Sequence, residues 1–145
     1  MPTVVVTGVS SGIGWGTANV LLQHGFQVFG SVRKSEDADR LSAEWGEAFT
    51  PLLFDITDDQ AVKLAAAVVG DRLQGQTLFG LVNNAGSAVP APLIYQPIRD
   101  YRQQLEVNLI GPLIVIQAFV DLLGADHQRS GQPGRIVNIS SVGGK

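Results

Sequence analysis

The sequence predicts an α/β fold in which helices cover both faces of a doubly wound parallel sheet, in three layers, α/β/α. Short apolar runs alternate with helical patterns along the 145 residues. The runs are apolar throughout rather than at every second residue, which is typical of parallel strands buried on both faces. Right-handed crossovers would place five such strands in the order 3-2-1-4-5. No repeat, linker or low-complexity segment interrupts the pattern, so residues 1–145 are expected to form a single, Rossmann-like domain.

The first half of the chain is predicted to supply strands at residues 4–6, 27–32 and 49–54. A helix over residues 13–24 is expected to end at Gly25, because glycine readily adopts the left-handed conformation that closes helices. Ser35 is expected to cap the next helix. Thr57 is expected to start a third helix, with Gln60 at the spacing of a capping box.

The second half is predicted to supply strands at residues 79–82 and 136–139, joined by a long helix over about 101–123 that ends at Gly124. The helix that follows Thr57 carries an apolar stripe that should face the sheet. The stripe consists of Val62, Ala65, Ala66, Val69 and Leu73.

Composition restricts the classes of function. The net charge is −3 with no basic run, so no nucleic-acid partner is expected. There is no cysteine, which excludes disulfides and thiol chemistry and fits a reducing compartment. The most apolar segment, 109–120, is shorter than the ~20 residues of a membrane span, and the first residues do not resemble a signal peptide. Neither His24 nor His127 has a partner at ligand spacing. We expect a cytoplasmic protein with no membrane partner and no metal.

A glycine-rich segment, T-G-V-S-S-G-I-G, joins the first strand to the first helix at residues 7–14. Glycines alone could merely close a turn. Between the first strand and helix of an alternating chain, however, they let the backbone approach a phosphate at the positive end of the helix. We therefore expect a dinucleotide cofactor here. Its expected contacts are Thr7, Gly8, Ser10, Ser11, Gly12, Ile13 and Gly14.

The end of the second strand, S-V-R-K, favours NADP(H) over NAD(H). A cofactor with a free ribose 2′-hydroxyl usually meets an acidic residue about 20 residues beyond the glycines. Here Arg33 and Lys34 occupy that place, and a cation suits a 2′-phosphate. NAD(H) stays possible, because the two cations could be a solvated surface pair with Glu36 and Asp37 close by.

Asp55 follows the third strand, and two roles are open for it. Its carboxylate could accept a hydrogen bond from the adenine amino group of a cofactor. It could equally form the turn before Thr57.

These residues together resemble the short-chain dehydrogenases/reductases. The family's glycine pattern matches residues 7–14, its Asn-Asn-Ala-Gly signature matches 83–86, its helix asparagine matches Asn108, and its serine strand matches 135–144. The resemblance implies hydride transfer between a nicotinamide and a carbonyl or alcohol substrate. It also implies a homo-dimer or homo-tetramer, with the helix 105–123 as part of the interface. It extends the expected cofactor contacts to Ile56, Asn83, Ala85 and Gly86.

The resemblance also implies catalytic roles. Ser141 would hold the substrate oxygen, although without the family pattern Ser140 and Ser141 could simply end a strand. Asn108 would hold a water that links the family's catalytic lysine to solvent, although it could be an ordinary helix amide. In the family, a Tyr-x-x-x-Lys pair is the acid/base, and no such pair precedes Lys145, which cannot itself be assigned the lysine's role.

The expectation is therefore a cofactor-binding portion of a reductase, incomplete at its C-terminal end and inactive by itself. Two alternatives remain: a dinucleotide-sensing module without catalysis, and a truncated remnant.

Overall fold

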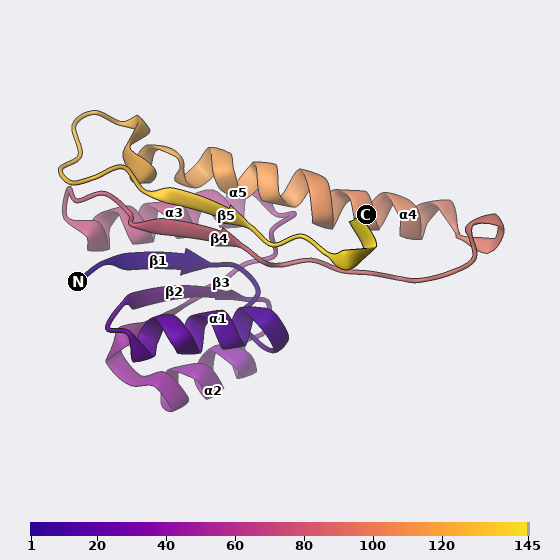
Figure 1. Ribbon diagram of the computed structural model, residues 1–145, viewed down its shortest axis with the longest axis horizontal. Coiled ribbons are helices and arrows are strands. Elements are labelled where there is room, and N and C mark those ends of the chain that lie inside the picture. Colours follow the sequence, from indigo (N-terminus) through magenta and orange to yellow (C-terminus); the bar gives the residue numbers. More distant parts are fainter. Residues whose placement is uncertain (145) are drawn as a thin grey trace.

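A parallel sheet organises the chain, as the computed structural model shows for residues 1–144 (Figure 1). Its five strands lie in the order β3-β2-β1-β4-β5, which confirms the predicted topology. They are β1 (Thr3–Val6), β2 (Gln27–Val32), β3 (Phe49–Leu53), β4 (Gly80–Asn83) and β5 (Arg135–Asn138). Each strand begins and ends within about one residue of its predicted bounds, as expected for strongly apolar runs. Lys145, to which no catalytic role was assigned, lies outside the described residues.

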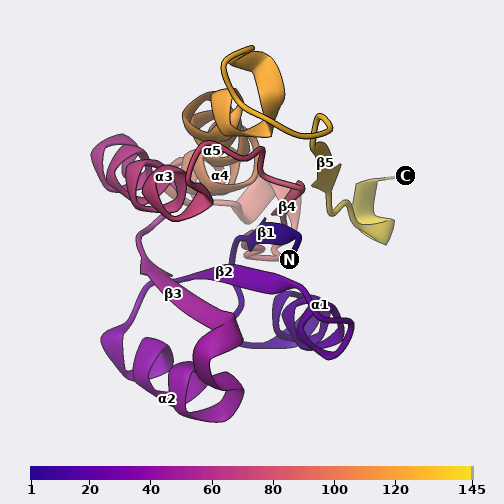
Figure 2. The same ribbon diagram turned by 90° about the vertical axis from the view of Figure 1, so that its left-hand side faces the viewer.

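Helices cover the sheet on both faces, which confirms the three layers (Figure 2). One layer contains α1 (Gly12–Gln23) and α2 (Ser35–Trp45). The other contains α3 (Asp59–Leu73), α4 (Ile98–Leu105) and α5 (Gly111–Phe119). No helix of the described chain is long and apolar enough to cross a bilayer.

Two apolar cores form because successive strand residues point to opposite faces of the sheet. Val5 of β1 packs into the core under α3 and α5, whereas Val4 and Val6 pack into the core under α1 and α2. Each of these side chains is at most 3% exposed, so each stabilises the fold by about 1.5–3 kcal/mol. The predicted stripe of α3, Val62 to Leu73, is buried in the first core.

The parallel register brings the carboxyl ends of the strands to one edge of the sheet. Val6 of β1 pairs with Gly30 of β2 on one side and with Val82 of β4 on the other. The loops that leave β1, β2, β3 and β4 therefore meet at that edge, where ligands bind in open α/β sheets.

Two predicted helix starts were wrong by a residue or two. Helix α2 begins at Ser35 itself, with Lys34 as the preceding residue and no side-chain cap. Helix α3 begins at Asp59 and is capped by Asp58, whose Oδ1 accepts a hydrogen bond from the Ala61 N–H at 3.1 Å. A carboxylate suits this position because the helix N-terminus is positive. Thr57 lies before the cap and bonds Asp55 instead.

The long helix predicted over 101–123 is a broken one. It begins earlier, with α4 at Ile98, and a wider π-helical turn, Glu106–Ile110, separates α4 from α5. Pro112, at the start of α5, has no N–H to donate to the preceding turn, which accounts for a local change of hydrogen bonding. After α5 the helix loosens over Asp121–Ala125 and closes at Gly124 in a positive-φ conformation, as predicted.

The strand β5, at one edge of the sheet, is not covered by helices as the other strands are. All residues of β5 are exposed, with Ile136 and Val137 at 40% and 49% exposure. Figure 2 shows β5 standing at the rim of the sheet, away from α1 and α2. The apolar run of residues 136–139 predicted the strand correctly but not its burial.

Candidate functional site

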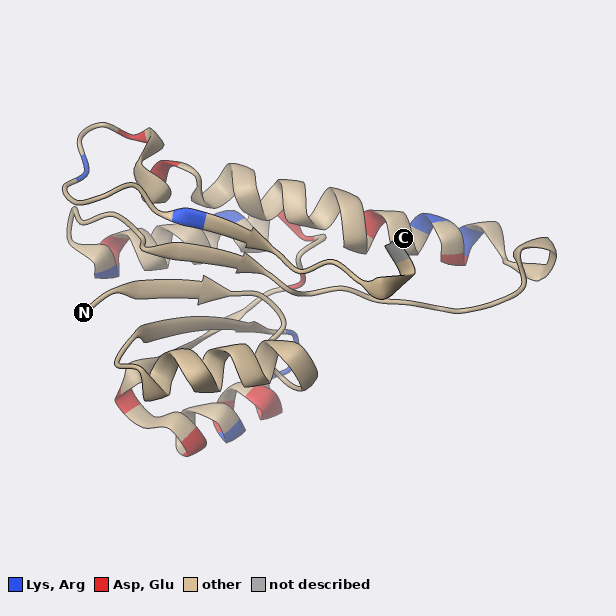
Figure 3. Cartoon of the chain, viewed as in Figure 1, with Lys and Arg blue, Asp and Glu red and all other residues tan. Residues whose placement is uncertain are grey.

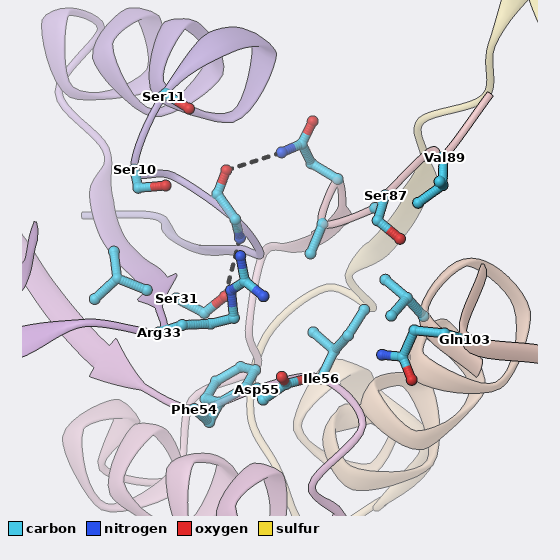
Figure 4. Close-up of a pocket in the computed structure, with 16 residues that line it drawn as sticks. Ser10, Ser11, Ser31, Arg33, Phe54, Asp55, Ile56, Ser87, Val89 and Gln103 are labelled. Carbon is cyan, nitrogen blue, oxygen red and sulfur yellow. Dashed lines mark hydrogen bonds between the residues drawn. The ribbon is translucent and has the colours of Figure 1, made fainter. Parts of the chain in front are cut away.

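A cavity of about 520 Å³ opens at the carboxyl edge of the sheet (Figure 4). It lies between the loops after β1, β2, β3 and β4, which is the place that the sequence predicted for a dinucleotide. Eight of the predicted cofactor-binding residues line it. They are Gly8, Ser10, Ser11, Arg33, Asp55, Ile56, Ala85 and Gly86.

The glycine loop is held in shape from both sides. Gly8 and Gly12 have φ angles of 71° and 61°, a region that favours glycine. The Gly8 N–H donates a hydrogen bond to Ser31 Oγ at 2.9 Å, and Ser31 is only 3% exposed. The Asn84 Nδ2 donates to the carbonyls of Thr7 and Gly8, both at 3.0 Å. Hydrogen bonds with two neighbouring strand ends therefore hold the loop in its conformation.

Thr7 and Gly14 support the loop from outside the cavity. Thr7 is buried, and its Oγ1 accepts hydrogen bonds from the N–H groups of Asn84 and Ala85, each at 3.0 Å. Gly14 is also buried, and a methyl group there would collide with the Gly8 carbonyl. Neither residue is among those that line the cavity, and both hold the loop in place; a direct contact with a cofactor stays a prediction for them.

The N-terminus of α1 offers N–H groups at the mouth of the loop. Ser11 precedes the helix in an extended conformation, with φ −163° and ψ 175°, and its side chain makes no capping hydrogen bond. The first N–H groups of a helix have no partner within the helix, and the helix dipole makes this end positive. Gly12 and Ile13 stand in this first turn and are exposed. This arrangement can bind an anion such as a pyrophosphate.

Arg33 and Lys34 differ in their placement. Arg33 is exposed and extends across Ser31 into the cavity on the side of the glycine loop (Figure 4). Lys34 is exposed at the start of α2 and does not belong to the lining. The structure thus brings the arginine, but not the lysine, to the cavity.

Asp55 forms the turn before α3 and also faces the cavity. Its Oδ1 accepts hydrogen bonds from the Thr57 N–H at 2.9 Å and the Thr57 Oγ1 hydroxyl at 2.8 Å. The backbone hydrogen bond from Thr57 is the main reason that the pKa of Asp55 lies below its usual 3.8; the Thr57 hydroxyl and the charge of Arg33 lower it further, against an opposing effect of burial. The turn-forming role is therefore present, and an adenine contact stays a prediction.

We predict that Asp55→Asn destabilises the protein at neutral pH and that this difference disappears in acid. A folded-state pKa below 3.8 means that the ionised carboxylate stabilises the fold above that pH. This stabilisation is lost as the pH falls through the lowered pKa. Urea unfolding of both proteins between pH 7 and about pH 2.5 would measure the difference. Asp39→Asn, an exposed position on α2, is the control and should change little. A difference for Asp55→Asn that does not vary with pH would contradict the account.

Asn83 connects strands rather than facing the cavity. It is 6% exposed, and its Nδ2 donates to Oδ1 of Asn138, its register partner on β5, at 2.9 Å. The pair ties β4 to the strand that leads to Ser141. The sequence by itself does not mark Asn138, because one asparagine in an apolar run carries no signal.

The residues assigned to catalysis lie outside the lining of the cavity. Asn108 stands in the π-helical turn and forms a pair of hydrogen bonds with the backbone of Ser87: Oδ1 accepts from the Ser87 N–H at 2.8 Å, and Nδ2 donates to the Ser87 carbonyl at 2.7 Å. It therefore orients a loop residue that lines the cavity. Ser141 is exposed, and its Oγ accepts a hydrogen bond from the Gly143 N–H at 3.1 Å.

Several site residues were not predicted from sequence. Ser87, Val89 and Gln103 line the cavity from the loop after β4 and from α4. Arg40 of α2 reaches back to the glycine loop and donates a hydrogen bond to the Ser10 carbonyl at 2.8 Å. No motif marks these residues, since only the fold brings them near the glycines. Within residues 1–144 there is no group of three or more His, Asp or Glu side chains that could hold a metal ion.

Known proteins are similar to this chain in sequence. The family model of the short chain dehydrogenases matches residues 2–145. The NADPH-dependent 3-dehydrocapnine reductase of Ornithobacterium rhinotracheale is 42% identical over 144 residues, which make up 99% of this chain and 50% of that protein. The serine 3-dehydrogenase of Rhizobium radiobacter is 36% identical over 143 residues, 97% of this chain and 53% of that protein. The chain thus spans about half the length of these curated relatives.

Solved structures are similar in the same way. A short-chain dehydrogenase from Streptomyces avermitilis superposes with a TM-score of 0.87 at 30% identity, covering 99% of this chain and 50% of the other. An NADPH-bound carbonyl reductase from chicken fatty liver gives a TM-score of 0.87 at 31% identity, covering 99% and 58%. With the family match over almost the whole sequence, these likenesses show that the chain belongs to the short chain dehydrogenase family.

Proposed function

We propose that the complete protein is an NADP(H)-dependent oxidoreductase that transfers hydride between the nicotinamide and a small carbonyl or alcohol substrate. The observation that carries the proposal is the hydrogen-bonded glycine loop beside Arg33 in one cavity. Two similar proteins add support, because the relative that is 42% identical is an NADPH-dependent reductase and the carbonyl reductase structure has NADPH bound.

The residues present fit such a cofactor. Gly8 has a φ of 71°, and a Cβ there would meet the backbone of Ala85 at 3.0 Å, so glycine suits the close packing of the glycine loop against the loop after β4. The first turn of α1 would bind the pyrophosphate, and Arg33, with Ser10 and Ser11, would bind a 2′-phosphate. Asp55 and Ile56 would contact the adenine, and Ala85 and Gly86 would lie beside the ribose. The bound nicotinamide supplies the hydride chemistry, and the protein supplies orientation and proton transfer.

In this proposal Ser141 holds the substrate oxygen, and Asn108 supports the route by which protons reach solvent. The observations fit a positioning task for Asn108, since both of its amide atoms hold Ser87 at the cavity. The resemblance implies a Tyr-x-x-x-Lys pair as the general acid/base, and this chain covers about half the length of the relatives. Cytoplasmic location and a homo-dimer or homo-tetramer complete the proposal. The helix α4–α5 supports the latter, because Leu105, Leu109 and Leu113 are 42%, 64% and 50% exposed.

We predict that Ser141→Ala in the complete protein lowers kcat about 100-fold, because one positioned donor at the reacting oxygen typically contributes that much. Ser140→Ala is the matched control on the neighbouring residue and should retain most of the activity. Steady-state kinetics with NADPH and a panel of small carbonyl compounds would measure both. Similar losses in the two variants would show that the hydroxyl was assigned wrongly.

The proposal as a whole is tested by titrating the purified protein with NADPH and NADH, with its intact mass and turnover recorded. The proposal is supported if the protein binds NADPH tightly, turns over substrate and has an intact mass above 15.4 kDa. Tight binding without turnover in a 15.4 kDa protein would favour a sensing module instead. A protein that binds neither cofactor would refute it.

A further inference from the structure

Arg40 joins α2 to the glycine loop across 30 residues of sequence. Its NH2 group donates a hydrogen bond to the Ser10 carbonyl at 2.8 Å. The same group lies 3.2 Å from Oδ1 of Asp37, and NH1 lies 3.8 Å from Oε2 of Glu44. Asp37 and Glu44, which precede and follow Arg40 in α2, thus hold its guanidinium against the glycine loop. Because Ser10 lines the cavity, the positive charge of Arg40 lies directly behind the cavity wall.

Acidic residues of α2 lie near the contact between Arg40 and Ser10 and would oppose the binding of a phosphate. Apart from Arg40, the charged residues of the helix are all acidic, and Figure 3 shows red positions on both sides of a blue one along it. Asp37 stands in the first turn of α2, four residues after Arg33, which directly follows β2. A phosphate near Arg33 would be repelled by an unpaired carboxylate there. The ion pair with Arg40 offsets the charge of Asp37 and leaves Glu36 as the other acidic residue in this turn.

Arg40 is not needed to hold α2 in place. Its side chain is 47% exposed, whereas the aromatic side chains of Trp15, Trp45 and Phe49 pack α2 against α1 and the sheet. Their ring centroids are 6.0 Å apart for Trp15 and Trp45 and 4.8 Å apart for Trp45 and Phe49. An exposed ion pair contributes little to stability. A contribution to ligand binding is therefore separable from a contribution to the fold.

We propose that Arg40 determines specificity for the 2′-phosphate of NADP(H): it fixes the Ser10 carbonyl and offsets the charge of Asp37. The inference rests on the proposed function and adds a second cation to it. A 2′-phosphate carries a charge near −2, whereas NAD(H) presents only a neutral hydroxyl at that point. The effect of the Arg40 charge should therefore fall on NADP(H), whereas an effect that came only through the Ser10 carbonyl would fall on both cofactors.

The test is calorimetric titration of NADP and NAD into the wild-type protein and Arg40→Gln, at low and at high salt. Glutamine keeps an amide donor but removes the charge. The Kd for NADP should rise about tenfold, and the Kd for NAD should change by less than about twofold, since a charge-assisted interaction contributes about that much. The rise should be smaller at high salt. Adding Asp37→Asn to Arg40→Gln should recover part of the NADP affinity, because the carboxylate no longer needs a partner.

Arg99→Gln provides the matched control. Arg99 lies on α4, its side chain is 88% exposed, and it pairs with Asp100 at 3.5 Å, so it offers the same change of charge away from the cavity. Equal rises in both Kd values for Arg40→Gln would show that Arg40 only shapes the loop, and no change would show that it does not act on the cofactor. Either result overturns the inference while the wild type still binds NADP. A wild-type protein that binds neither cofactor would overturn the proposed function as well.

Discussion

Replacing Gly14 by alanine is expected to have the largest effect of any single change at the site. An added Cβ would collide with the Gly8 carbonyl and with the Asn84 amide, which itself holds the loop through hydrogen bonds to Thr7 and Gly8. Neither neighbour can move without opening the loop. We expect a loss of about 1–3 kcal/mol in the free energy of unfolding, the usual cost of overpacking. We also expect the Kd for NADP to rise on the order of 100-fold, measured by titration calorimetry alongside urea unfolding.

Gly16→Ala is the matched control for this prediction. It makes the same chemical change two positions along α1, where a Cβ would meet nothing within 4 Å. Because alanine has a higher helix propensity than glycine, the change should stabilise the protein by up to about 1 kcal/mol. It should leave NADP binding unchanged. If Gly14→Ala and Gly16→Ala behaved alike, close packing of the loop against the helix would not be what shapes the site.

The second large effect is expected from Arg33→Asp, which should shift the cofactor preference from NADP toward NAD. The change removes a cation that can bind the 2′-phosphate and puts a carboxylate in its place, close to the carboxylate of Asp55. The Kd for NADP should rise about 100-fold, because a charge-assisted hydrogen bond to the phosphate is removed and a repulsion between carboxylate and phosphate replaces it. The Kd for NAD should fall or stay unchanged, because a carboxylate at the end of β2 can accept hydrogen bonds from a free ribose.

Arg99→Asp controls for the change in net charge, because Arg99 is exposed on α4 and does not line the cavity. It should leave both Kd values within about twofold of the wild type. Equal NADP affinity before and after Arg33→Asp would contradict the assignment of Arg33 to the 2′-phosphate.

The sequence predicted the strands and their order well because each strand is a short, continuous apolar run. The five runs predicted the correct strands and order, and Gly25, predicted to end a helix in the left-handed conformation, has a positive φ. The ends of the helices were harder to predict, because neighbouring polar residues compete for the capping position. Thr57 and Asp58 can both cap a helix. Asp58 caps α3, because Thr57 donates its hydrogen bonds to Asp55 instead.

Features that depend on contacts between distant segments escaped prediction. The π-helical turn is followed directly by Gly111, where an added Cβ would lie only 2.6 Å from Ile56 in the loop after β3. The contact of Arg40 with Ser10 and the pairing of Asn83 with Asn138 likewise join residues that are far apart in sequence. The exposure of β5 also could not be read from an apolar run, which looks the same in a covered and an uncovered strand.

A crystal structure of the protein with NADP bound would test the central claim most directly. The account predicts the pyrophosphate at the first turn of α1, against Gly12 and Ile13, with the 2′-phosphate within hydrogen-bond distance of the Arg33 guanidinium. Binding of NADP elsewhere on the molecule, or a 2′-phosphate that points away from Arg33 into solvent, would contradict it.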